Sequence, residues 1–264
     1  MTTIAPTRPS LTSNDAAVLQ ALFDVESSPS SGIRIDPSLP SWPSGLNISQ
    51  ADLASLQQRE TEIIRKLQSS ETPSQECVQS ALNDLDILLD QYPTYPSGYT
   101  NRAQTLRLLV DILHQSHDTQ TLESNSDSES EDTLFTPETT DLSSRILADL
   151  GQAITLATPA SPADPVSSVQ ARLLADAHTH RGYLLLKAAR KRKTPFGQDD
   201  AAAAGPERLR GLGADQLEEM ASRDFFFGGR YGNKFAQQLA VQTNPYAKMC
   251  GAIVKEAMRK EVEG

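Results

Sequence analysis

The sequence predicts an all-α fold made of helical hairpins, and two observations carry this prediction. Apolar residues recur three and four positions apart over much of the chain, as expected for helices that bury one face. One spacing also recurs, in which a bulky residue is followed four positions later by a small one and three positions after that by a large one. The small residue allows a second helix to approach closely, so each occurrence predicts the first helix of a hairpin. The two occurrences are Tyr99, Ala103, Leu106 and His178, Gly182, Leu185.

Residues 1–48 are predicted to form an N-terminal extension. Residues 13–24 fit a short helix, because a serine and an asparagine can cap it and apolar residues follow at helical spacing. Four prolines between residues 27 and 45 then predict an extended connector. We interpret Trp42, within this connector, as a packing residue rather than a ligand-binding one.

The first hairpin follows this extension. Apolar residues recur at helical spacing over residues 49–67, and a break follows around Pro73. Residues 75–91 fit a second helix, which ends before Pro93. The buried face of this second helix is predicted from Ala81, Leu85 and Leu88.

The second hairpin is predicted to be interrupted by an acidic insertion, residues 114–141. Its first helix is predicted over residues 97–112, and its second helix resumes at residues 142–157 with Ile146, Leu150 and Ala153 at the spacing of the first hairpin. The insertion carries eight acidic residues with no lysine or arginine between them. We therefore expect it to be disordered.

The third hairpin begins with a long helix over residues 167–192, and a loop rich in glycine and proline follows at residues 193–213. Its second helix is predicted from Ala221, Phe225 and Gly228, which repeat the second-helix spacing. Two further helices are expected to cover the last apolar face of the array. The predicted boundaries are thus 1–48 for the extension and 49–262 for the hairpin domain, with repeats at about 49–93, 97–157 and 167–232 and C-terminal helices at 233–262.

The composition of the chain indicates its cellular compartment and excludes some classes of partner. The net charge of −10 lies mostly in the acidic insertion, so no basic surface is expected and nucleic acid is excluded as a partner. No run approaches the roughly 20 apolar residues of a membrane helix. Cys77 and Cys250 lie far apart in a chain without an apolar leader, which favours a reducing, cytoplasmic location. The run ARKRK at residues 189–193 leaves nuclear import as an alternative to a solvated helix end.

Several segments together resemble the tetratricopeptide repeat protein 36 family. They are NDAAVLQALF, GYTNRAQTLRL, RGYLL, ASRDF with FAQQLAV, and NPYAKMC, in the order found in that family. The resemblance implies a right-handed superhelix of three tetratricopeptide helical hairpins, with an N-terminal helical extension and a C-terminal capping helix. It also implies a non-catalytic adaptor associated with chaperones of the Hsp70 class. The acidic insertion, the basic third loop and the degenerate first repeat depart from the family pattern.

The residues do not favour binding of an acidic chaperone tail. Related repeat proteins hold such tails with lysine, arginine and asparagine side chains. Only Asn101 occupies a matching position here, whereas Gln57 and Thr61 replace the expected residues of the first repeat. Asp176 and His180 replace those of the third, and a carboxylate disfavours an acidic ligand.

Two functional interpretations remain. In the first, the protein is an adaptor and a monomer, and its concave groove binds a segment of a partner protein, either an Hsp70-class chaperone or a client. In the second, the protein's own N-terminal connector fills the groove, which makes the chain a structural or regulatory subunit. The residues predicted to line the groove are Gln57, Tyr99, Asn101, Arg102, His178 and Arg181.

No enzymatic chemistry is predicted. The chain has no HExxH motif, glycine-rich phosphate loop, CxxC pair or nucleophile elbow. His178 and His180 lie two positions apart and therefore point about 200° apart on a helix, which disfavours a shared metal. We therefore expect no catalytic residues, no cofactor and no metal.

Overall fold

The computed structural model describes residues 33–46, 48–69, 72–118, 133–161, 163–193, 205–244 and residue 259. Within these ranges every regular element is helical, which confirms the all-α class. The predicted helix at 13–24 and most of the predicted C-terminal helix lie outside the described residues. The α-helices are α2 (Gln50–Gln68), α3 (Gln75–Gln91), α4 (Pro96–Asp118), α5 (Thr140–Ala157), α6 (Ser168–Lys193), α8 (Ala214–Arg230) and α9 (Lys234–Thr243). Short 3-10 helices cover Ser44–Leu46, Thr133–Phe135 and Glu207–Leu209.

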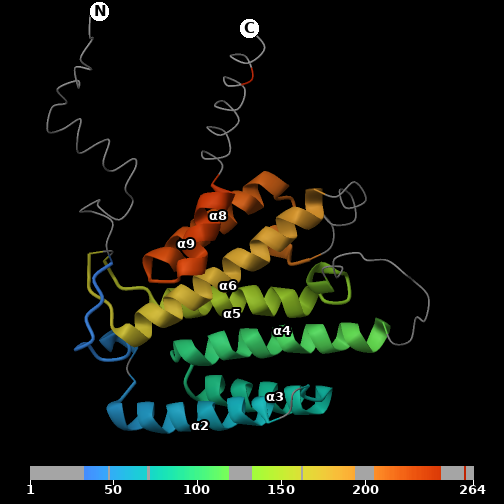
Figure 1. Cartoon of the computed structure of the whole chain (residues 1–264). Helices are drawn as coiled ribbons and strands as arrows, with labels where there is room; N and C mark the ends of the chain where they lie inside the picture. Colours follow the sequence, from blue (N-terminus) through green and yellow to red (C-terminus); the bar gives the residue numbers. More distant parts are fainter. Residues whose placement is uncertain are drawn as a thin grey trace, which may run out of the picture.

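The helices pack in the order of the chain. Each of α2 to α6 contacts the next helix along the sequence, α6 contacts α8, and α8 contacts α9. Figure 1 shows the result as a layered stack, with α2 and α3 at one end and α8 and α9 at the other. None of the helices in the described ranges combines the length and the apolar character that a membrane span requires.

Local sequence signals explain where the helices begin and end. The side chains of Ser49, Ser74 and Asn233 each accept a hydrogen bond from a backbone N–H in the first turn of α2, α3 and α9. Pro93 follows the end of α3, and Pro96 occupies the first position of α4. A backbone N–H at this position has no acceptor within the helix, so the missing N–H of proline costs no hydrogen bond.

Small residues bring α6 and α8 close together. A methyl group on Gly182 would lie 3.0 Å from the ring of Phe225, and one on Gly228 would lie 2.7 Å from the hydroxyl of Thr179. Neither position has room for a side chain. This close approach places the side chains of α6 and α8 within hydrogen-bonding distance of one another.

The boundaries predicted for the acidic insertion were wrong at both ends. Helix α4 continues to Asp118, and α5 begins at Thr140. Between them, Leu134 and Phe135 are buried in a 3-10 helix. These two apolar side chains gain more from burial than they lose in chain entropy, so this end of the insertion is ordered. The most acidic part, residues 119–132, lies outside the described residues.

The N-terminal connector packs against the helices. Ile35 forms a parallel β-bridge with Val166, the residue two positions before α6. Trp42 is buried, and its ring meets that of Tyr95 edge-on at 6.1 Å between centroids. This placement confirms the interpretation of Trp42 as a packing residue.

Candidate functional site

The six residues predicted to line one groove lie in three separate places. Adjacent helix positions point about 100° apart, so Asn101 and Arg102 face different neighbours. Gln57 and Asn101 line a cavity of about 290 Å³ between α2, α4 and α6. Tyr99 and Arg102 belong to a polar network around α4, while His178 and Arg181 line a larger pocket. The positions of these residues do not test whether they bind a partner protein, so this binding stays a prediction.

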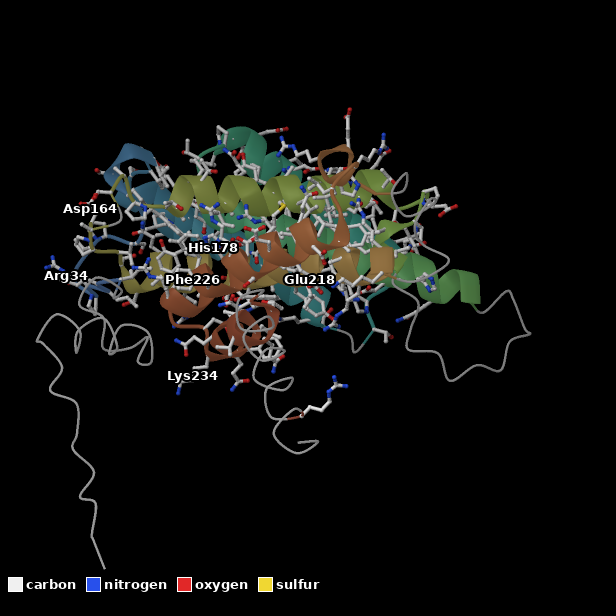
Figure 2. All side chains as sticks on the ribbon, turned by 90° about the horizontal axis from the view of Figure 1, so that it is seen from above. Arg34, Asp164, His178, Glu218, Phe226 and Lys234 are labelled. Atoms are coloured by element: carbon white, nitrogen blue, oxygen red, sulfur yellow. The ribbon has the colours of Figure 1, made fainter. Side chains whose placement is uncertain are left out.

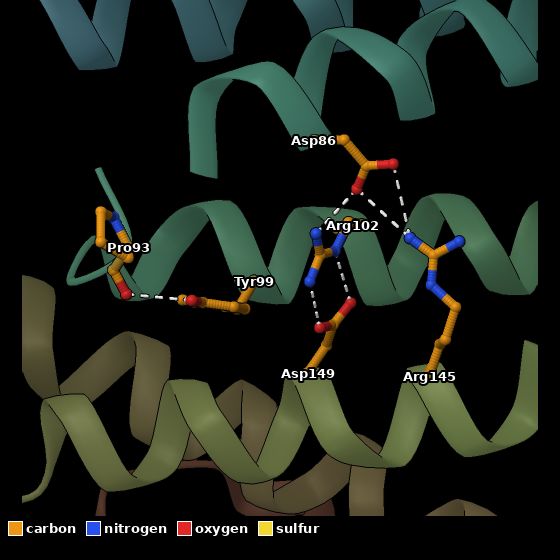
Figure 3. A network of polar contacts seen from close by, with 6 residues as sticks. All are labelled: Asp86, Pro93, Tyr99, Arg102, Arg145 and Asp149. Atoms are coloured by element: carbon orange, nitrogen blue, oxygen red, sulfur yellow. Dashed lines mark hydrogen bonds and ion pairs between the residues drawn. The ribbon is translucent and has the colours of Figure 1, made fainter. Parts of the chain in front are cut away.

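Arg102 joins three helices. Its Nε and Nη2 donate to the two carboxylate oxygens of Asp149 on α5, at 2.8 and 2.6 Å. Its Nη1 donates to Asp86 on α3 at 2.7 Å, and its guanidinium carbon lies 5.4 Å from the centre of the Tyr99 ring. The hydroxyl of Tyr99 donates to the carbonyl oxygen of Pro93 (Figure 3). The carboxylates raise the pKa of Arg102, so this side chain acts as a permanently charged structural link.

The side chain of Asn101 is engaged by a half-buried carboxylate. Its amide donates to Glu60 at 2.5 Å, and the hydroxyl of Tyr95 donates to the same carboxylate at 2.8 Å. Burial raises the pKa of Glu60, although these hydrogen bonds lower it. In the same cavity, burial and, to a smaller extent, the charge of Arg107 together lower the pKa of His180 to about 4. The amide of Asn101 is therefore not free to hold an acidic tail.

A pocket of about 770 Å³, hereafter the α5–α6–α8 pocket, lies between these three helices. This volume is within the range of small-molecule sites. Figure 2 shows His178 among the helices, near the middle of the view from above, whereas Arg34 and Lys234 lie at its periphery. The polar and aromatic lining residues that matter below are His178 and Arg181 from α6, Arg208 from the 3-10 helix, and Arg223, Phe227 and Tyr231 from α8.

A buried carboxylate organises the base of this pocket. Asp224 accepts hydrogen bonds from Nε and Nη2 of Arg181 at 2.8 and 2.7 Å, and its Oδ1 lies 2.8 Å from Nδ1 of His178. Burial alone would raise the pKa of Asp224, but the hydrogen bonds from Arg181 and His178 outweigh it and lower the pKa. Asp224 therefore stays ionised, and Nδ1 of His178 is the donor in this pair.

Aromatic rings form one wall of the pocket. The His178 ring stacks with Phe227 at 5.3 Å and with Tyr231 at 6.1 Å between centroids. The guanidinium of Arg223 lies 5.9 Å from the centre of the Phe227 ring. Arg208 and Arg223 form no ion pair with any described residue, so their charges are available to a ligand. The described residues contain no cluster of three or more histidine, cysteine or acidic side chains that could hold a metal ion.

Sequence reasoning missed Asp224, Arg208 and Arg223 as site residues. A signal for Asp224 was present, because it lies three positions after Ala221 and four before Gly228 on a face that was predicted to be buried. A carboxylate on such a face requires a cationic partner. No comparable signal marks the two exposed arginines.

The chain is 64% identical to the L-tyrosine degradation gene cluster protein hmgX of Aspergillus fumigatus over 263 residues, which cover all of this chain and 98% of the relative. No family model and no solved structure matches the chain. The tyrosine-degradation relative overturns the predicted membership in the tetratricopeptide repeat protein 36 family, and with it the predicted adaptor function and the association with Hsp70-class chaperones. The resemblance depended on short segments such as NDAAVLQALF and NPYAKMC, together with spacings of small and large residues that any closely packed helical hairpin requires.

Proposed function

Because this chain belongs to the family of the L-tyrosine degradation gene cluster protein hmgX, we propose that it takes part in L-tyrosine degradation as a non-catalytic ligand-binding protein. The site of binding is the α5–α6–α8 pocket. The observation that carries the proposal is the 64% identity to the relative over all of this chain and 98% of the relative.

The pocket supports a binding role through its shape and its chemistry. It is enclosed by helices on three sides, it presents aromatic rings, and two of its guanidinium groups have no carboxylate partner among the described residues. Binding sites for small molecules combine an apolar wall with a few convergent polar groups in this way.

The arrangement around Asp224 supports a non-catalytic role. A carboxylate that orients a catalytic histidine serves mainly that histidine. Here Arg181 donates a hydrogen bond to each oxygen of Asp224, and His178 lies within hydrogen-bonding distance of one of them, so the negative charge is shared between two partners. We therefore assign His178, Arg181 and Asp224 to holding the pocket in shape.

Growth on L-tyrosine tests the proposal. Disruption of the gene in its own host is expected to abolish growth with L-tyrosine as the only carbon source, while growth on glucose continues. Normal growth of the disrupted strain on L-tyrosine would exclude a part in the pathway.

Complementation then tests the pocket. Ala148 is an exposed residue of α5 that lines the pocket, and Gln152 is an exposed residue of the same helix that does not. We expect the wild-type gene and the Gln152→Trp variant to restore growth, and the Ala148→Trp variant to fail because its ring fills the pocket. Restoration by Ala148→Trp would mean that the pathway role does not use this pocket.

A cytoplasmic location and a monomeric state complete the proposal. The cationic run predicted as a possible import signal is engaged in intramolecular contacts: Lys191 donates to the carbonyl oxygen of Phe135, Arg192 donates to that of Leu209, and Lys193 pairs with Glu218. These contacts support a structural role for the run. A fluorescent fusion that is concentrated in the nucleus would contradict this location.

We also infer that the hairpins α2–α3, α4–α5 and α6–α8 stack with a right-handed superhelical sense. The chain-order packing supports the stacking, because each helix rests on its neighbours in sequence. The right-handed sense stays a prediction. An experimental structure showing a left-handed arrangement of the hairpins would refute it.

A further inference from the structure

The second and third hairpins contain the same charged pair. Arg102 directly precedes the small residue of its helix, and Arg181 does the same in the third hairpin. Each donates from Nε and Nη2 to both oxygens of one aspartate on the second helix of its hairpin, which is Asp149 for Arg102 and Asp224 for Arg181. In both hairpins these two nitrogens are therefore committed to a structural carboxylate.

The hairpins differ at the third nitrogen of the guanidinium. Nη1 of Arg102 donates to Asp86, which lies on α3, the helix before the hairpin. The residue of α5 that matches Asp86 is Gly151. Asp86 directly follows Leu85, and Gly151 directly follows Leu150, which are the central residues of the recurring second-helix spacing. A methyl group on Gly151 would lie 3.9 Å from Nη1 of Arg181. Nη1 of Arg181 thus faces the place of a carboxylate that the chain itself does not supply.

The surroundings of this nitrogen favour an anion and disfavour a cation. Arg208 and Arg223 line the same pocket and have no acidic partner among the described residues. The buried carboxylate of Asp224 is already engaged on both oxygens, and Glu207 is exposed at the rim. An ammonium group in the pocket would meet three guanidinium groups without a free buried carboxylate to pair with.

The pocket wall is suited to an aromatic ring. The ring of His178 on α6 stacks with the rings of Phe227 and Tyr231 from α8 and its C-terminal end, and Leu147 and Ile154 add apolar surface from α5. Offset stacking on such rings stabilises an aromatic ligand beyond the burial of its surface.

We infer that the α5–α6–α8 pocket binds an aromatic carboxylate without an α-ammonium group, and that this carboxylate occupies on Arg181 the place that Asp86 occupies on Arg102. The inference rests on the proposed function, since it takes the pocket to be the ligand site of a tyrosine-degradation protein. The ligand ring lies against His178 and Tyr231, and Arg223 adds charge at the mouth of the pocket.

Isothermal titration of the purified full chain with matched probes tests the ligand class. The compound 3-(4-hydroxyphenyl)propionate has the ring and carboxylate of L-tyrosine without the ammonium group, and tyramine has the ring and ammonium without the carboxylate. We expect the propionate to bind, L-tyrosine to bind roughly tenfold more weakly or worse, and tyramine not to bind. Replacing the ring, as in 3-cyclohexylpropionate, should weaken binding by roughly tenfold. Equal or tighter binding of L-tyrosine would overturn the inference.

Variants of Gly151 test where the carboxylate lies. Gly151→Asp supplies a carboxylate from the chain and should weaken binding of 3-(4-hydroxyphenyl)propionate by roughly a hundredfold. Gly151→Asn has nearly the same size without the charge and should retain clearly more affinity. Gly151→Ala adds only a small uncharged group beside Nη1 of Arg181, so it should weaken binding less than Gly151→Asp does. Equal affinities of the aspartate and alanine variants would refute the assigned position.

Circular dichroism would reveal whether Gly151→Asp fails to fold. A second variant tests the inference in that case. Arg223 is exposed, so Arg223→Gln should fold and should weaken binding of the propionate by roughly fivefold. Absence of any effect would count against the role of Arg223. If the chain binds none of the aromatic acids while gene disruption stops growth on L-tyrosine, this inference falls and the proposed function stands. If it binds them while the disrupted strain grows normally, the proposed function falls.

Discussion

Arg102 shows how single residues of this chain combine charge with burial. The side chain of its partner Asp149 is only 6% exposed, so the pair lies in a region of low dielectric constant. The outer pair of Arg145 with Asp86 is far more exposed. The two pairs belong to one network, but the buried pair should contribute much more to the free energy of unfolding than the exposed pair.

Replacement of Arg102 tests this difference. We expect Arg102→Met to lower the free energy of unfolding by about 3–5 kcal/mol, because Asp149 is then buried without a counter-charge. Arg145→Met should cost less than about 1 kcal/mol. Urea unfolding followed by circular dichroism measures both. Similar losses in the two variants would show that burial does not govern the network.

The glycines of the third hairpin give a second test at the residue scale. Gly182→Ala should cost about 1–3 kcal/mol, because its methyl group would meet the ring of Phe225 at 3.0 Å and Cβ of Asp224 at 3.1 Å. Gly151→Ala is the matched control, since a helix gains about 0.5–1 kcal/mol from this change where space permits. Thermal unfolding of the two variants should therefore shift in opposite directions, and a shift of both in the same direction would be inconsistent with the packing.

At the scale of elements, α6 carries two histidines with different surroundings. His178 pairs with Asp224 on one side of the helix, whereas His180 is half-buried on the other, in the cavity that α6 shares with α2 and α4. The element thus separates the proposed ligand pocket from a cavity that contains the half-buried Glu60.

The burial of His180 predicts a pH dependence. The unfolded chain binds a proton on this histidine near pH 6.5, whereas burial and Arg107 delay protonation in the folded chain to about pH 4. The unfolded state therefore binds more protons in between, and stability falls by about 3 kcal/mol as the pH drops from 6.5 to 4. Denaturant unfolding at several pH values measures this loss.

His180→Gln provides the control for this prediction. Glu60 contributes in the opposite direction, because its raised pKa lets the folded state take up a proton at higher pH than the unfolded state. Comparison with the variant removes that contribution and those of the other groups. The variant should lose about 3 kcal/mol less than the wild type over the same range. Identical pH profiles would contradict the assigned burial.

At the scale of the whole molecule, the connector at 33–46 links hairpins that are distant in sequence. Ile35 pairs with Val166 before α6, the carbonyl oxygen of Leu46 accepts a hydrogen bond from Thr94 before α4, and Trp42 packs on Tyr95. The hairpins otherwise contact mainly their immediate neighbours. The connector is therefore expected to strengthen the cooperativity of unfolding.

Removal of the Trp42 ring tests this role. Trp42→Ala should lower the free energy of unfolding by about 3–5 kcal/mol through the lost packing. Trp42→Phe should retain most of the stability, because the Nε1 group of Trp42 is buried without a hydrogen-bond partner in the described structure and nothing is lost with it. Chemical denaturation with two probes would report both the loss and any separation of the transitions. A Trp42→Ala variant as stable as the wild type would refute the linking role.

The whole molecule also sets where the proposed ligand pocket forms. Its walls come from α5 of the second hairpin and from α6 and α8 of the third, so it exists only when these hairpins are docked. The periodicity within one helix contains no information about this docking. For that reason the sequence placed His178 and Arg181 in a groove with Asn101, although Asn101 faces a different cavity.

The sequence by itself determined the all-α class, the starts of α2, α3 and α9 and the succession of hairpins, because apolar periodicity, capping side chains and prolines act within a few residues. It did not determine the family, since the spacing around Ala103 and Gly182 is required by close helix packing in general. Only the tertiary structure decided which charges are buried together and that Leu134 and Phe135 order one end of the insertion. It also decided that Gly151 lies beside Arg181 where Asp86 lies beside Arg102. These outcomes depend on contacts between helices that are distant in sequence, and no local pattern encodes such contacts.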